Sequence, residues 1–141
     1  MKVTAWVLLS VLCAGAPVAV RAQAAAPTKA RSHDEKRFSG LAAKLGTTPQ
    51  ALADAFETAR QQDPTLKHKD FMTANVLAHN LGGGNSKVTT AALLAGLKAG
   101  KTLRQTLVTL GLKAEDAKAA EKAAKAEVEE VDPKGSEKSN D

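Results

Sequence analysis

The stretch 70–85, DFMTANVLAHNLGGGN, constrains the fold more than any other part of the chain. On a helical wheel, Phe71 and Leu77 lie on one side, and Met72 lies on the opposite side. A surface helix has a single apolar stripe, so a helix that is apolar on two sides is expected to lie between other helices. The glycines that follow are typical of a helix end, because glycine adopts the left-handed conformation without a steric penalty. The sequence therefore predicts that residues 63–81 form the central helix of a small domain.

Other segments show the apolar spacing of amphipathic helices, with capping residues before them and glycine or proline after them. Ser32 and Glu35 match a capping box, and Asp63 is the expected N-cap of the central helix. No segment has the alternating pattern of a strand. The predicted fold is all-α, a small orthogonal bundle of five to six short helices over residues 32–131.

The first residues, 1–24, have the pattern of a secretory signal peptide. A positive start precedes the apolar run 3–16, and small residues precede two candidate cleavage sites, after Ala22 and after Ala24. The run is short for a membrane span, and an uncleaved anchor is the alternative. We therefore expect a protein exported to the periplasm or the extracellular space. A mobile leader over 25–31 would follow, with no membrane span after cleavage.

Cleavage would remove the only cysteine and the only tryptophan of the chain. The chain also lacks tyrosine, so its remaining aromatic residues would be Phe38, Phe56 and Phe71. Without disulfides, an alanine- and leucine-rich core would have to stabilise the exported protein by itself.

Basic residues dominate the body of the chain, and acidic residues dominate its end. The whole chain has a net charge of +5. Residues 25–114 contain thirteen basic and six acidic side chains, whereas residues 115–141 contain nine acidic and five basic ones. This asymmetry favours an anionic partner or self-association through opposite ends, and simple solubility is the other explanation.

Residues 114–131 form the last predicted helix, which is rich in Ala, Lys and Glu. Its inward stripe is almost all alanine until Val128. Because an alanine methyl buries little apolar area, we expect residues 114–125 to dock loosely. The helix beyond Glu127 is expected to fray into a polar disordered tail over 132–141.

Residues 41–52 resemble the helix-turn-helix motif of DNA-binding proteins. Ala42, Gly46 and Leu52 stand where that family has a small residue, a turn glycine and an apolar residue. The resemblance implies nucleic-acid binding, and it covers about twenty residues. Any tight pair of crossed helices needs the same three residues, and carboxylates on the second helix would repel phosphate. Nucleic acid is therefore an alternative partner, not the leading one.

The histidines suggest a second alternative, a soft-metal carrier. His68 and Met72 are four residues apart on one helix face, a spacing that offers a soft ligand pair to copper but an incomplete site. Asn75 and His79 have the same spacing. We take His68, Met72, Asn75 and His79 as a candidate polar pocket, with a hydrogen-bonded structural pair as the other reading of Asn75 and His79.

No catalytic set emerges from the sequence. It has no serine in a nucleophile turn, and its carboxylates follow exposed helix faces. Residues 95–102 match only the loosest form of a phosphate-binding loop and lack the preceding strand that this chemistry needs. We expect no cofactor and no enzymatic activity. The leading hypothesis is an exported interaction protein whose basic body meets anionic envelope polymers or a protein partner.

Overall fold

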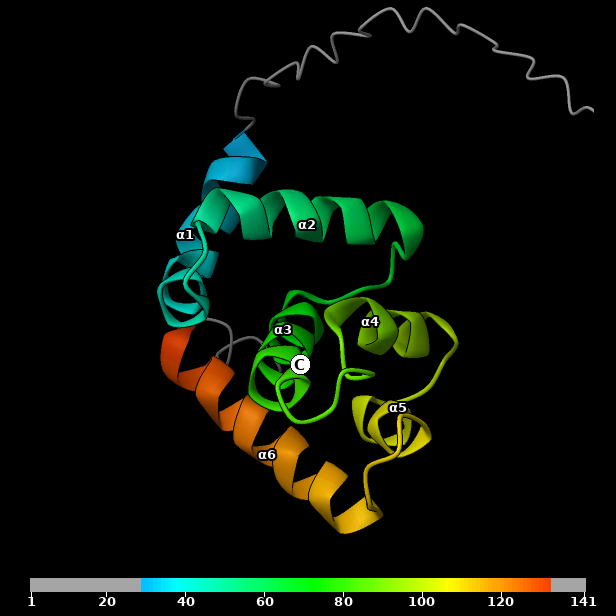
Figure 1. Ribbon diagram of the computed structural model, residues 1–141. Coiled ribbons are helices and arrows are strands. Elements are labelled where there is room, and N and C mark those ends of the chain that lie inside the picture. The colour runs from blue at the N-terminus through cyan, green and yellow to red at the C-terminus, as the bar shows by residue number, and fades with distance from the viewer. Residues whose placement is uncertain (1–28, 133–141) are drawn as a thin grey trace, which may run out of the picture.

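The computed structural model describes residues 29–132, which form six helices and no strand (Figure 1). The prediction of an all-α fold is confirmed for this part of the chain. The helices are α1 (Lys29–Leu45), α2 (Pro49–Gln62), α3 (His68–Gly82), α4 (Thr90–Lys98), α5 (Leu103–Thr109) and α6 (Ala114–Val131). The predicted signal peptide and the tail after Asp132 lie outside the described residues.

Helix α3 lies at the centre of the bundle and packs against α1, α4 and α6. Figure 1 shows α6 along one side of α3 and α4 on another. The buried residues of α3 come from more than one of its faces: Phe71, Met72, Thr73, Ala74, Val76 and Leu77. The prediction of a central helix apolar on two sides is therefore confirmed.

Three phenylalanines join α1 and α2 to the central helix. The rings of Phe38, Phe56 and Phe71 lie with their centroids 5.2–5.7 Å apart. Two of the three contacts are edge-to-face, the arrangement that the ring quadrupoles favour. Each such pair contributes about 0.5–1.5 kcal/mol beyond its buried area. All the aromatic residues expected in the exported chain thus form one cluster.

Threonine caps three of the helices. Thr48, Thr89 and Thr102 each accept a hydrogen bond from the backbone N–H three residues later, at 3.1–3.2 Å. In α5, Gln105 also accepts a hydrogen bond from the Thr102 N–H at 2.9 Å, which completes a capping box. Each cap satisfies backbone donors that the helix itself leaves unpaired.

Glycines end three helices in the left-handed conformation, but not α3. The φ angles of Gly46, Gly100 and Gly111 are 66°, 77° and 103°. The prediction of a left-handed stop after α3 is wrong, because Gly83 has φ −66° and ψ −31°. Glycine at position 82 serves close packing instead, since a Cβ there would lie 3.3 Å from the carbonyl oxygen of Val88.

Two predicted helix starts are also wrong. Ser32 lies inside α1, which begins at Lys29, because the residues before the serine are themselves good helix formers. Asp63 ends α2 and does not cap α3, because its Oδ1 accepts hydrogen bonds from the N–H and the hydroxyl of Thr65. This turn lets Leu66 enter the core, and α3 starts at His68.

Helix α6 does not fray where the sequence predicted. Val128 is 2% exposed, and the helix continues to Val131. Lys44 of α1 pairs with Glu127 at 2.6 Å, and Arg37 of α1 pairs with Asp132 at 2.8 Å. Asp132 is buried, although it was expected to begin the disordered tail. Small side chains along α6 allow a close approach to its neighbours, so an alanine stripe does not imply loose docking.

Gly40 offers a direct test of this packing. A Cβ at position 40 would lie 2.9 Å from the carbonyl oxygen of Val131. We expect Gly40→Ala to destabilise the protein by about 1–3 kcal/mol, although alanine is the better helix former. Chemical denaturation measures the change. Gly83→Ala is the matched control, because nothing lies within 4 Å of its added methyl. A Gly40→Ala variant that is as stable as the control would mean that the end of α6 is loose.

Candidate functional site

The structure does not bring the four residues of the predicted polar pocket together. Met72 is fully buried in the core, and His79 is exposed. His68 lies among the phenylalanines, and Asn75 faces α4. No hydrogen bond joins any two of the four. Asn75 lines a groove between α2, α3 and α4.

His68 occupies an apolar environment at the start of α3. Its ring lies 4.3 Å from the Phe38 ring and 4.5 Å from the Phe56 ring. Neither ring nitrogen makes a hydrogen bond, and the nearest carboxylate oxygen, from Asp34, is 3.5 Å from Nε2. Burial, with a smaller contribution from the Arg37 guanidinium, lowers the pKa of His68 from 6.5 to about 4, whereas the carboxylates of Asp34 and Asp132 act to raise it. His68 is therefore neutral at pH 7.

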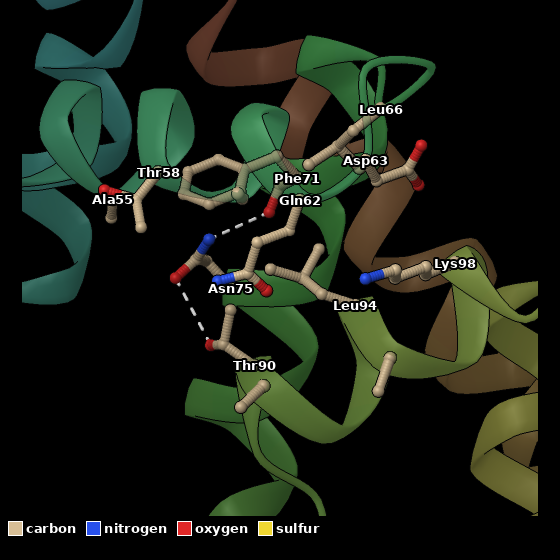
Figure 2. A pocket seen from close by; sticks show the side chains of 13 residues that line it. Ala55, Thr58, Gln62, Asp63, Leu66, Phe71, Asn75, Thr90, Leu94 and Lys98 are labelled. Carbon is tan, nitrogen blue, oxygen red and sulfur yellow. Dashed lines mark hydrogen bonds between the residues drawn. The ribbon is translucent and has the colours of Figure 1, made fainter.

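Asn75 joins α3 to α4 at the edge of a groove. Its carbonyl oxygen accepts a hydrogen bond from the Thr90 hydroxyl at 3.3 Å, and its amide donates to the Phe71 carbonyl oxygen at 2.9 Å. Figure 2 shows both bonds at the side of the groove. These two bonds hold the amide plane in one orientation and leave its second N–H unused.

The groove lies between α2, α3 and α4 and has a volume of about 630 Å³. Leu66 and Phe71 are its buried apolar floor, and Leu94 of α4 is half-buried at its side. Alanines form much of the two facing walls: Ala55 and Ala59 on α2, and Ala91 and Ala95 on α4. Because these side chains are short, α2 and α4 face each other without closing the space between them.

A second feature is a basic surface on α4, α5 and the following loop. Residues 71–114 contain no Asp or Glu but five Lys or Arg. We define the basic surface as Lys98, Lys101, Arg104 and Lys113, all of them exposed. None of the four forms an ion pair or a side-chain hydrogen bond with another described residue. Lys101 and Arg104 flank a shallow hollow that also includes Val108. Among the described residues, Val108 is the one large apolar side chain that is exposed.

The segment that resembles a helix-turn-helix forms two packed helices, as that motif requires. Ala42 and Leu52 are buried between α1 and α2, and Gly46 makes the turn at φ 66°. The outward residues of α2 include Glu57. This carboxylate would lie toward phosphate if α2 entered a DNA groove.

The described residues hold no group of three or more His, Cys, Asp or Glu side chains placed to bind a metal ion. The pair His68 and Met72, predicted as soft ligands for copper, lies within the packed core. Between residues 29 and 132, no helix has the length and apolar character needed to cross a membrane.

Comparison of the chain with known protein families, with curated proteins and with solved structures finds no match.

The sequence predicted a basic body, but it predicted neither the position of the basic surface on α4 and α5 nor the groove. The basic surface had a readable signal, because residues 71–114 form an uninterrupted run without a carboxylate. The groove had almost none, because its walls come from helices whose relative placement no local pattern encodes. The sequence of α4 held a weak signal, because its apolar residues lie on more faces than α3 and α5 cover.

The burial of His68 predicts an acid sensitivity. In the unfolded chain its pKa is near 6.5, and in the folded protein it is about 4, so the unfolded state binds the proton first. Folding stability should be full above pH 6.5 and should fall as the pH decreases toward 4. Arg37, Asp34, Asp132 and His33 are the charged groups that act on the ring.

Denaturation curves from pH 7.5 to pH 4 measure this effect. We expect His68→Leu to lose stability less steeply over that interval than the unchanged protein. His79→Leu is the control, because its side chain is exposed. Equal slopes for the His68→Leu variant and the unchanged protein would contradict the prediction.

Proposed function

We propose that the protein is an exported, non-enzymatic binding protein that holds anionic polymers on its basic surface. The proposal rests on the grouping of Lys98, Lys101, Arg104 and Lys113 on neighbouring elements. None of them forms an ion pair with another described residue.

Several basic side chains elsewhere in the described part of the chain form ion pairs: Arg37 with Asp132, Lys44 with Glu127, Lys69 with Glu129 and Lys125 with Glu121. These pairs involve α1, α3, α6 and the residue after α6. Exposed lysines such as Lys36 and Lys118 lie in stretches that also contain carboxylates. The cations of α4, α5 and the following loop differ from them, because their stretch of the sequence contains no carboxylate.

The chemistry of this surface suits a polymer with repeated charges. Each exposed cation attracts a single phosphate or carboxylate only weakly in water. When several neighbouring cations neutralise one polymer, the counterions condensed on that polymer are released, and this release favours binding. The surface is bounded by Glu115 and Asp116 at the start of α6, which are exposed and carry the opposite charge. This boundary would confine the polymer to α4 and α5.

Export supports the same partner class. Export, which the signal-peptide pattern over 1–24 predicts, would bring the protein to where phosphate- and carboxylate-rich polymers of the cell envelope are abundant. Recovery of the protein from the envelope or the medium, with an N-terminus after Ala22 or Ala24, tests this part of the proposal. An intact Met1 on protein recovered from the cytoplasm would contradict it and would favour duplex DNA as the anionic polymer.

The binding surface can be tested with inorganic polyphosphate and poly-glutamate as probes. We expect both to bind at low salt, with an affinity that falls steeply as salt rises. Replacing Lys101 and Arg104 by Gln should weaken binding and reduce the slope of log K against log salt by about two. Titration calorimetry over a salt series measures both quantities.

The matched control removes two lysines that are already paired, Lys69 and Lys125. It changes the net charge by the same amount, so it separates a local surface from an effect of overall charge. Equal losses in the two double variants, or no salt-dependent binding by the unchanged protein, would overturn the proposal. Tighter binding to one duplex DNA sequence than to either probe would favour the helix-turn-helix alternative.

A further inference from the structure

We infer that the groove between α2, α3 and α4 is a binding site for a small amphipathic carboxylate, such as a medium-chain fatty acid. This site differs from the basic surface in both ligand and location, and Lys98 lies where the two features meet.

The first argument is the shape and lining of the groove. Its volume of about 630 Å³ is in the range of small-molecule sites, which are mostly apolar and hold few polar groups. Phe71 and Leu66 form its buried floor, and Leu94 with the exposed alanines Ala55, Ala91 and Ala95 provides the apolar surface that remains open to water. An alkyl chain laid against Leu94 and these alanines would remove apolar surface from water on both partners.

The second argument is the charge at the rim. Lys98 is the one basic residue in the lining, and Asp63 is the one acidic residue. Oδ1 of Asp63 already accepts two hydrogen bonds from Thr65, at 3.0 and 2.6 Å. Figure 2 shows the Lys98 side chain extended toward Leu94, whereas the carboxylate of Asp63 points outward. The groove therefore offers an ammonium group beside its apolar floor, which is complementary to a carboxylate.

The third argument concerns the polar groups inside the groove. Asn75 is held by Thr90 and by the Phe71 carbonyl, and its second N–H remains available as a donor. Thr58 already donates its hydroxyl hydrogen to the backbone oxygen of Asp54. A carboxylate or ester oxygen near Asn75 would accept this free N–H, whereas an apolar ligand would leave it unused.

The same lining disfavours other occupants. Phe71 is 1% exposed and presents no open face on which a nucleobase could stack. One lysine is too little charge for a polyphosphate group. The segment after Asp132, PKGSEKSND, contains no large apolar side chain that would fill the groove from within the chain.

Decanoate is a suitable probe, with 1-decanol as its uncharged counterpart. We expect saturable binding of decanoate below its micelle concentration, measured by calorimetry and by amide shifts of residues in α3 and α4. Lys98→Gln should weaken decanoate binding several-fold and leave decanol binding unchanged. Lys98→Arg should retain decanoate binding.

A second variant tests the location. Replacing Ala55 and Ala95 by Leu places two larger side chains on the facing walls of the groove and should weaken binding of both probes at least tenfold. The control replaces Ala51 and Ala99, which are exposed on or next to the same helices but do not line the groove. Thermal melts confirm that both double variants are folded.

Three outcomes would overturn the inference: no saturable binding of decanoate, equal effects of the groove variant and its control, or no effect of Lys98→Gln. The Lys101 and Arg104 double variant, which should lose polyanion binding, should keep decanoate binding. Failure of the groove site is thereby distinguished from failure of the basic surface.

Discussion

The packing of α3 against helices on opposite sides is the constraint on which the rest of the structure depends. Phe71 meets the rings of α1 and α2, while other faces of the same helix meet α4 and α6. A chain with three phenylalanines and no disulfide in its described part has few large groups with which to build a core. Placing a helix that is apolar on two sides in the middle lets its large side chains contact helices on both sides.

Small residues produce two opposite results in this bundle. At Gly40 and along α6, they bring backbones close together and allow the last helix to pack tightly. On α2 and α4, alanines face each other across a gap and leave the groove open. The difference comes from the helix spacing. Where two helices are in contact, small side chains let their backbones come close, and where α2 and α4 face each other at a distance, alanines are too short to fill the space.

Charge is also distributed unevenly among the helices. The acidic residues of α6 neutralise cations on α1 and α3, and these pairs hold the long helix against the bundle. The stretch that forms α4 and α5 has no carboxylates and keeps its cations exposed. The proposed polymer-binding surface and the proposed carboxylate site both depend on this segregation, because an anion meets little repulsion at that end of the molecule.

Much of the local structure was determined by the sequence itself. The threonine caps of α2, α4 and α5 and the glycine stops at 46, 100 and 111 rest on interactions within a few residues. Such interactions are readable because the partners are neighbours in the chain. The central place of α3 was also predictable, since a helix apolar on two sides has to be covered on both.

Only the tertiary structure decided the rest. Ser32 and Asp63 are both residue types that can cap a helix. However, α1 begins earlier, at Lys29, and the turn in which Asp63 accepts a hydrogen bond from Thr65 delays the start of α3 to His68. The end of α6 is ordered by partners on α1, far away in the sequence, which no local pattern reveals. The groove exists because α2 and α4 do not pack closely against each other, and its location depends on how these two helices and α3 are placed. Sequence periodicity determines which face of a helix is apolar, whereas packing determines whether that face is covered.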